Sequence, residues 1–161
     1  MHKPSILLAD DHSLILEGFR RILEGRYTLL GTASDGRTLL ELAKSLEPDV
    51  IMLDVSMPLL NGIDAATQIK KLIPHTKLIF VTMHADTDYV RAAFEAGASG
   101  YVLKQSAVDE LDQAIRAVLA GHQYITPLIT KDLLDVFLSR ETLKPSGSSS
   151  LTMRQREVLQ L

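Results

Sequence analysis

Five polar residues stand directly after apolar, strand-like runs, and together their side chains could bind a metal ion and a phosphoryl group. They are Asp10, Asp11, Asp54, Thr82 and Lys104. Continuous apolar runs of this kind are typical of strands that are buried on both faces of a parallel sheet. The carboxyl ends of such strands meet at one edge, where open α/β sheets bind their ligands. We therefore expect three carboxylates, a hydroxyl and an ammonium group to lie close together.

The chemistry of these side chains favours a magnesium site that supports phosphoryl transfer. Mg²⁺ commonly takes one or two carboxylates together with phosphate oxygens and water. An ammonium group and a hydroxyl can bind phosphoryl oxygens, as Lys104 and Thr82 would here. A carboxylate can itself be the nucleophile and form an aspartyl phosphate. Asp54 stands by itself after its strand and is the candidate nucleophile, whereas the adjacent Asp10 and Asp11 are better placed to hold the metal.

Each of these residues also has a simpler structural interpretation. An aspartate between a strand and a helix is most often an N-cap, and a lysine or threonine at a strand end is usually solvated. The coincidence of suitable residues at four strand ends favours the functional interpretation, because independent caps would not produce this set. His12 and His84 could lie near the site, but two histidines without further ligand spacing make a weak case for a transition metal.

Strands and helices alternate five times along the chain. Apolar residues at helical spacing predict the first helix over residues 12–24, closed by Gly25. The alternation predicts parallel β-α-β units with right-handed crossovers. Since the first and third strands carry the acids, we predict an α/β, flavodoxin-like, doubly wound sheet of five parallel strands in the order 2-1-3-4-5. The predicted strands cover residues 6–9, 27–33, 50–53, 78–81 and 100–103.

The predicted domain organisation is one complete domain followed by part of a second. The compact domain is predicted to cover residues 1–121, and residues 122–150 to contain a short helix from residue 128 and a serine-rich linker. Residues 151–161 are predicted to begin another helix, because Thr152 and Gln155 have the spacing of a capping box. We expect the chain to stop as this second domain opens.

Composition narrows the functional class. A chain of 161 residues can hold one domain plus a fragment. Its net charge of −3 argues against nucleic-acid binding by the chain as a whole. The absence of cysteine from the sequence excludes disulfides and thiolate metal sites. No apolar run approaches the ~20 residues that cross a bilayer, and the start lacks a signal-peptide apolar region, so we expect a cytoplasmic protein without a membrane partner.

These motifs as a set resemble the receiver domain of two-component response regulators. The resemblance covers residues 4 to about 121 and rests on four motifs, which are Asp10-Asp11, Asp54-Val-Ser-Met-Pro with Asn61-Gly62, Thr82, and Tyr101-Val-Leu-Lys104. The closing segment Leu151-Thr-Met-Arg-Gln-Arg-Glu-Val-Leu is similar to the opening of a LuxR-type helix-turn-helix domain. This second resemblance points to the NarL/FixJ type.

The resemblance implies a phosphoacceptor and a metal site. Asp54 would accept a phosphoryl group from a sensor histidine kinase. Asp10, Asp11 and Asp54 would bind Mg²⁺ together with the backbone carbonyl of Ser56.

The resemblance also implies a conformational switch and its partners. Lys104, Thr82 and the Met83 amide would contact the phosphoryl oxygens, and Tyr101 would be a switch residue that follows Thr82. The whole protein would form a homodimer and bind promoter DNA through the domain that follows the receiver.

Two positions depart from the family pattern. Gln105 follows Lys104 where many receivers have a proline with a cis bond, and a cis bond without proline would cost about 2.5–4 kcal/mol. Leu59 stands where a glycine is frequent, so the loop after Asp54 is expected to be less pliable. Neither change removes a chemical group from the site.

Two other functions compete with that of a response regulator. An Mg²⁺-dependent phosphatase with an aspartyl nucleophile, similar to the haloacid dehalogenases, would need a second aspartate where Ser56 stands. A pseudo-receiver, which binds partners without being phosphorylated, would not need the intact acidic set.

Overall fold

The computed structural model describes residues 3–131. Residues up to Pro127 form one compact unit, and residues from Leu128 onward form a second. In the second unit, residues 128–131 are helical, as predicted. The rest of the predicted helix, the predicted serine-rich linker and the predicted start of a helix-turn-helix domain lie outside the described residues.

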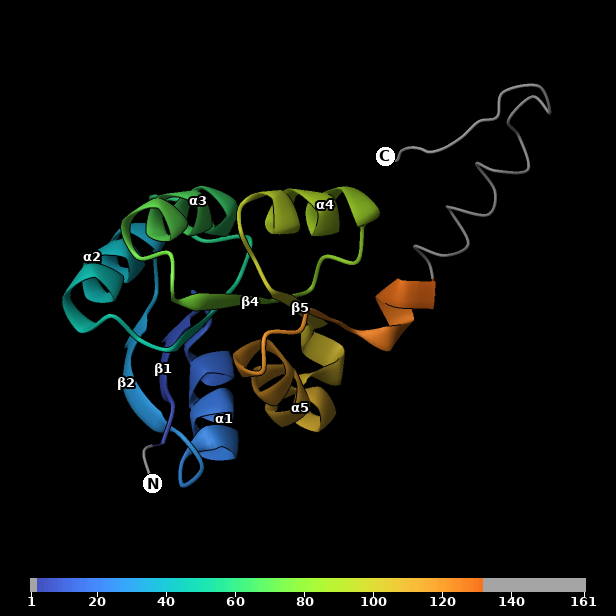
Figure 1. Ribbon diagram of the computed structural model, residues 1–161, viewed down its shortest axis with the longest axis horizontal. Coiled ribbons are helices and arrows are strands. Elements are labelled where there is room, and N and C mark those ends of the chain that lie inside the picture. Colours follow the sequence, from blue (N-terminus) through green and yellow to red (C-terminus); the bar gives the residue numbers. More distant parts are fainter. Residues whose placement is uncertain (1–2, 132–161) are drawn as a thin grey trace. The chain divides into compact units, whose positions relative to one another are not determined.

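Six parallel strands form one sheet in the order β2-β1-β3-β4-β5-β6 (Figure 1). The predicted order 2-1-3-4-5 is confirmed, and the sheet has one strand more than predicted. β6 has two residues, too few to show the period of an extended strand in the sequence. The strands are β1 (Ser5–Ala9), β2 (Thr28–Ala33), β3 (Val50–Leu53), β4 (Lys77–Thr82), β5 (Gly100–Leu103) and β6 (Tyr124–Ile125).

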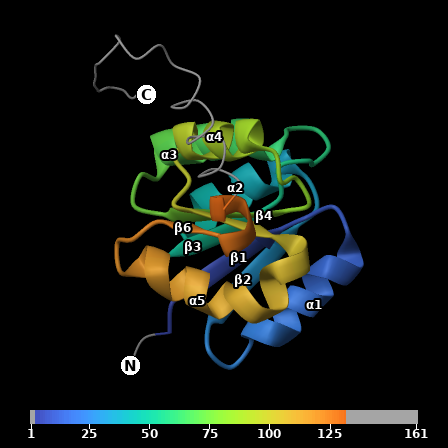
Figure 2. The same ribbon diagram turned by 90° about the vertical axis from the view of Figure 1, so that its right-hand side faces the viewer.

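Helices cover both faces of the sheet, as expected of a doubly wound fold. α1 and α5 lie on one face, and α2, α3 and α4 lie on the other (Figures 1 and 2). A short 3₁₀-helix, η1, joins β5 to α5. The bounds are α1 (Ser13–Leu23), α2 (Gly36–Leu46), α3 (Gly62–Leu72), α4 (Thr87–Glu95), η1 (Lys104–Ser106) and α5 (Ala107–Leu119).

The core explains why the strands are apolar without alternation. Ile6 and Leu8 of β1 face a cluster that includes Phe19 of α1 and Leu111 of α5. Leu7, between them in the sequence, is equally inaccessible to solvent. Successive side chains of a strand point to opposite faces, so a strand with helices on both sides needs apolar residues throughout.

The register of the sheet sets where the strand ends fall. Ala9 pairs with Leu53, and Leu53 pairs with Phe80. Asp10 and Asp54 therefore each follow a residue of the same paired row, and the two acids leave the sheet side by side.

Side chains cap the starts of α2 and α3 but not that of α4. Asp35 caps α2 by accepting a hydrogen bond from the Thr38 amide at 2.7 Å. Asn61 caps α3 in the same way. Asp86 occupies the N-cap position of α4, but within the described residues its side chain makes no capping bond.

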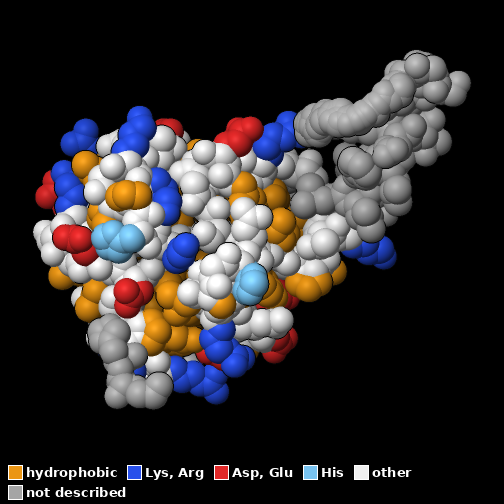
Figure 3. Space-filling view, viewed as in Figure 1, with side chains coloured by type: hydrophobic (Ala, Val, Ile, Leu, Met, Phe, Trp, Pro, Cys, Tyr) orange, Lys and Arg blue, Asp and Glu red, His pale blue; other side chains and the backbone are white. Residues whose placement is uncertain are grey.

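The described surface contains basic, acidic and apolar side chains. On the face shown in Figure 3 they are interspersed, and no continuous basic surface is visible there. Over residues 3–131, no helix combines the length and the apolar character that crossing a membrane requires.

Candidate functional site

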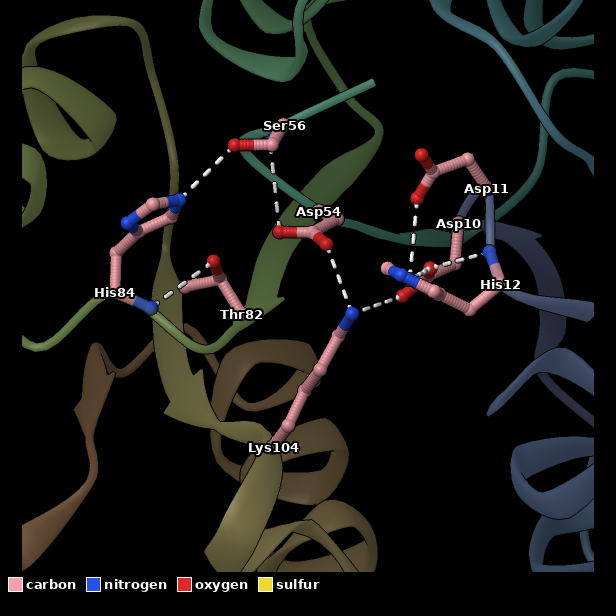
Figure 4. Close-up of polar contacts among 8 residues, drawn as sticks. All are labelled: Asp10, Asp11, His12, Asp54, Ser56, Thr82, His84 and Lys104. Carbon is pink, nitrogen blue, oxygen red and sulfur yellow. Dashed lines mark hydrogen bonds and ion pairs between the residues drawn. The ribbon is translucent and has the colours of Figure 1, made fainter. Parts of the chain in front are cut away.

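The carboxyl edge of the sheet brings the predicted charged residues together (Figure 4). Asp10 follows β1, Asp54 follows β3, and Lys104 is the first residue of η1 after β5. The Lys104 ammonium lies between the two acids, with Nζ 2.7 Å from Asp10 Oδ2 and 2.8 Å from Asp54 Oδ2. Lys104 is thus bonded to two acids that lie 50 and more positions away from it in the sequence.

The central groups of this site are buried and charged. Asp10 and Asp54 are 2% and 4% exposed, and the Lys104 side chain is 6% exposed. Burial opposes the charge of the Lys104 ammonium, but hydrogen bonds to Asp10 and Asp54 outweigh it and hold its pKa above the usual value. Lys104 is therefore a fixed positive charge at neutral pH.

An acidic cluster surrounds this lysine. Oxygen atoms of Asp10, Asp11 and Asp54 and a ring nitrogen of His12 all lie within 4.8 Å of one another. Asp11 is partly exposed, so the cluster opens to solvent on its side. Three carboxylates carry more negative charge than the Lys104 ammonium neutralises. Hard oxygen donors with excess negative charge and solvent access fit Mg²⁺.

His12 is part of the site, although the sequence made only a weak case for it. Its Nδ1 lies 2.9 Å from Asp10 Oδ1 and 3.1 Å from Asp11 Oδ1. The His12 amide also donates to Asp10 Oδ1 at 2.9 Å. Its position directly after the acid pair was the signal that pointed to this contact.

The loop after Asp54 is held close to the strand by a glycine. A Cβ on Gly62, the first residue of α3, would overlap the Asp54 carbonyl oxygen. The Gly62 amide donates to the Val55 carbonyl at 2.8 Å. This close approach accounts for Asn61-Gly62 in the motif.

The same loop contains a residue in an unfavourable backbone conformation. Leu59 has a φ of 68°, in the left-handed region, and its side chain is 74% exposed. Left-handed backbone costs an ordinary residue roughly 1–2 kcal/mol. The frequent family glycine at this position therefore has a backbone reason, and Leu59 retains the strain. Gln105, which stands where many receivers have a proline, causes no such strain, because all described peptide bonds are trans, including Lys104–Gln105.

Thr82 and Tyr101 lie at the same edge but contact His84 rather than Asp54. Thr82 is fully buried, and its hydroxyl accepts a hydrogen bond from the His84 amide at 3.3 Å. The buried Tyr101 hydroxyl donates to the His84 carbonyl at 2.7 Å. Burial and the nearby Asp54 charge raise the pKa of Tyr101, so it is a neutral hydrogen-bond donor. The two residues hold one segment of the β4–α4 loop.

His84 also links two loops above the site, a contact that the sequence did not predict. Its Nε2 lies 2.9 Å from Ser56 Oγ, across from the β3–α3 loop (Figure 4). Its ring stacks on Tyr89, with centroids 4.4 Å apart. Ser56 in turn places its amide 3.4 Å from Asp54 Oδ1. Only the fold shows this pairing, because Ser56 and His84 are 28 positions apart.

An acidic cluster around a buried lysine, at the carboxyl edge of a doubly wound parallel sheet, is the arrangement of a receiver domain. A family model described as the response regulator receiver domain matches residues 6–116. The chain belongs to this family.

Its relatives include transcriptional regulators and solved receivers. The transcriptional regulatory protein DegU of Brevibacillus brevis is 34% identical over 176 residues, which cover 99% of this chain and 75% of DegU. The crystal structure of a two-component response regulator of the LuxR family from Aurantimonas sp. SI85-9A1 is 35% identical with a TM-score of 0.81, covering 84% of this chain and 99% of that one. The isolated receiver domain of RcsB from Salmonella enterica serovar Typhimurium, solved with the phosphomimetic BeF₃⁻, is 27% identical with a TM-score of 0.74, covering 81% and 98%.

These likenesses confirm the interpretation of the chain as a two-component response regulator of the NarL and LuxR type. They do not favour the phosphatase or the pseudo-receiver.

Proposed function

We propose that Asp54 is the phosphoacceptor and that its phosphorylation by a sensor histidine kinase switches the surface of the receiver. The observation that carries this proposal is the bond between the buried Asp54 carboxylate and Lys104, within an acidic cluster that has more negative than positive charge. Phosphoryl transfer depends mainly on positioning and on charge neutralisation.

The proposed metal ligands are carboxylates of Asp10, Asp11 and Asp54 and the backbone carbonyl of Ser56. A bound Mg²⁺ would supply positive charge at the phosphoryl oxygens. Lys104 would keep Asp10 and Asp54 in place when the metal is absent, since it lies within 2.8 Å of both.

The proposed step moves one phosphoryl group. A carboxylate oxygen of Asp54 forms a bond to phosphorus while the bond from phosphorus to the kinase histidine nitrogen breaks, and that histidine leaves with its electron pair. Lys104, the Thr82 hydroxyl and the Met83 amide would then bind the phosphoryl oxygens. Charge-assisted hydrogen bonds of this kind are the strong ones.

The proposed switch uses the contacts around His84. Thr82 would turn its hydroxyl to the new phosphoryl group and change its contact with the His84 amide, and Tyr101 would follow as it holds the His84 carbonyl. Moving such a two-state element from mostly off to mostly on takes about 5.5 kcal/mol of differential stabilisation. Several new charge-assisted bonds can supply it.

The test of the phosphoacceptor is an intact-mass measurement. The chain, incubated with Mg²⁺ and acetyl phosphate, is expected to gain the mass of one phosphoryl group, and Asp54→Asn is expected to gain none. Asp64→Asn is the matched control, because Asp64 is an exposed carboxylate in the first turn of α3 that bonds to Asn61. A phosphoryl adduct on Asp54→Asn would overturn the assignment.

The test of the metal site is thermal unfolding with and without Mg²⁺. A ligand that binds only the folded state raises stability with its concentration. Mg²⁺ is expected to raise the Tm of the wild type, and to raise that of Asp11→Asn much less. Equal shifts in both proteins would exclude Asp11 from the metal site.

The remaining functional assignments are also proposals. We infer a signalling domain without multiple turnover, and sustained hydrolysis of p-nitrophenyl phosphate would contradict this. Residues 1–121 would form the receiver, residues 122–150 a helix and linker, and residues 151–161 the start of a DNA-binding domain. The whole protein would act in the cytoplasm as a homodimer on promoter DNA. The net charge of −3 supports DNA contact through the later domain, because phosphate contacts need a basic face.

A further inference from the structure

A buried threonine directly follows the sixth strand, beside the strand that leads to Lys104. β6 pairs in parallel with β5, with Tyr101 opposite Ile125. The next residue, Thr126, is fully buried. Its amide donates to the Tyr101 carbonyl at 2.9 Å. Its hydroxyl oxygen accepts a hydrogen bond from the Leu103 amide at 3.0 Å.

The Thr126 hydroxyl accepts from an amide that has no paired residue in β6. β6 ends at Ile125, so the register between β5 and β6 does not extend to Leu103. Leu103 is 4% exposed, and a buried amide needs an acceptor. The Thr126 hydroxyl takes the place that a carbonyl of a longer β6 would have.

The amide that Thr126 holds belongs to the residue before Lys104. Leu103 has extended backbone with φ −77° and ψ 139°, and the chain turns into η1 directly after it. The turn aims the Lys104 side chain at Asp54, where Nζ lies 2.8 Å from Oδ2. A shift of Leu103 would therefore move the Lys104 Cα relative to both acids.

We propose that Thr126 is a positioning residue for phosphoryl acceptance, acting through the Leu103 amide on Lys104. The proposal rests on the proposed phosphoacceptor role of Asp54. The contacts of Thr126 that bear on this role are those with the Tyr101 carbonyl and the Leu103 amide. Its effect is to fix the backbone from which Lys104 extends.

The sheet offers a matched control at its opposite edge. Thr76, just before β4, is also fully buried, and its hydroxyl donates to the Pro48 carbonyl at 2.8 Å. Thr76→Val and Thr126→Val each remove one buried hydroxyl and leave the size of the side chain nearly unchanged. Thr126 is bonded to β5, which leads to Lys104, whereas the Thr76 hydroxyl is bonded to the Pro48 carbonyl.

The experiment compares phosphorylation rates in the 161-residue chain. Thr126→Val is expected to take up the phosphoryl group from acetyl phosphate and Mg²⁺ about tenfold more slowly than wild type, since small displacements of a positioned group have large rate effects. Thr126→Ser keeps the acceptor and is expected to restore the rate. Thr76→Val is expected to react at the wild-type rate. The Mg²⁺ affinity of Thr126→Val is expected to stay within twofold of wild type, because its carboxylates are unchanged.

The outcomes separate this inference from the function on which it rests. If the wild type forms no adduct, the phosphoacceptor proposal fails. If the wild type reacts and Thr126→Val reacts equally fast, or if serine does not restore the rate, the positioning role alone is overturned. Equal slowing in Thr76→Val would show a general effect of lost stability and would also overturn it.

A measurement on the wild type covers the case in which Thr126→Val does not fold. Amide NMR signals of Leu103 and Thr126 are expected to shift when Mg²⁺ and beryllofluoride are added, while the amide of Thr76 stays in place. Unchanged Leu103 and Thr126 signals in a protein whose Asp54 signal moves would overturn the coupling.

Discussion

The two edges of the same sheet use polar side chains in different ways. At the amino edge, where the strands begin, polar groups satisfy the backbone. Asp49 accepts from the Ser5 amide at 2.8 Å, and Ser5 Oγ accepts from the Asp49 amide at 2.9 Å. Thr76 and Lys70 bond to backbone carbonyls there. At the carboxyl edge, Thr126 and Tyr101 also bond to the backbone, but three charged side chains face one another there as well, those of Asp10, Asp54 and Lys104.

The difference shows how a structural polar residue can be told from a functional one. Bonds to the backbone are complete as they stand and hold the strand ends in place. Clustered acids repel one another, and Lys104 offsets only part of the repulsion between Asp10, Asp11 and Asp54. The negative charge that remains uncompensated favours the binding of a cation.

Removing a lysine at each edge gives the largest contrast. Lys104→Met is expected to slow adduct formation from acetyl phosphate by about a hundredfold or more, the usual effect of losing a donor to a developing charge. Lys70→Met is the control, because Lys70 Nζ donates to the Pro74 and Thr76 carbonyls and contacts no acid of the site in the described structure. Lys70→Met is expected to lose stability and keep the rate. Intact-mass time courses measure both, and a similar rate loss in the two variants would remove the distinction between the edges.

Two buried threonines, one just before β4 and one at its last residue, sharpen the comparison. Thr76→Val leaves the buried Pro48 carbonyl without its 2.8 Å donor and is expected to lower the free energy of unfolding by about 1–3 kcal/mol. Thr82→Val loses a longer bond of 3.3 Å to the partly exposed His84, and is expected to cost less than about 1 kcal/mol. Urea denaturation of both variants tests the order. A larger loss for Thr82→Val would show that the carboxyl edge also carries stability.

High pH is expected to weaken the amino edge through Tyr27. The Tyr27 hydroxyl donates to Asp112 at 2.6 Å, and burial, followed by that bond, raises its pKa to about 12 from 10.0. Between these values the unfolded chain has already released the proton and the folded chain has not. The Tyr27 contribution is therefore complete below pH 10.0 and is lost as the pH rises through about 12.

The measurement is urea unfolding of wild type and Tyr27→Phe at pH 8 and pH 11. The gap in stability between them is expected to narrow at the higher pH. Tyr101 and Tyr124 titrate in both proteins, so they cancel in the difference. A gap that stays constant would contradict the proposed cause.

The smallest expected effects come from two residues in the left-handed backbone region, one near each edge. Leu59→Gly relieves a φ of 68° in the loop after Asp54, and Glu47→Gly relieves a φ of 44° at the end of α2. Each is expected to raise the free energy of unfolding by about 0.5–1 kcal/mol, after the entropy that glycine adds to the unfolded chain. Leu59→Gly is also expected to change the phosphorylation rate, whereas Glu47→Gly is not. Denaturation and intact-mass time courses test both parts.

The sequence was sufficient for the order of the first five strands and for the charged residues of the site. Apolar runs followed by Asp10, Asp54 and Lys104 are enough to predict that these residues lie together, because a parallel sheet brings the carboxyl ends of its strands to one edge. β6 was missed because two residues have no detectable period, and the bond between Thr126 and the Leu103 amide was missed with it.

Contacts between loops were the other part that the sequence could not supply. Ser56 and His84 meet because the β3–α3 and β4–α4 loops bend toward each other, and no local pattern encodes that bend. The boundaries differed by a residue or so, as for α1, predicted over 12–24 and observed over Ser13–Leu23. Such differences are expected at frayed helix ends.

The pairing of Ala9 with Leu53 has a consequence for how this molecule can tolerate insertions. One residue added within β1 would displace Asp10 by about 3.3 Å along the strand and turn every following side chain to the opposite layer. The same residue added on a helix surface or in a connecting turn would leave both acids where they are. Insertions are therefore tolerated in the connections but not in the strands, because the length of each strand sets the position of the charged residue that follows it.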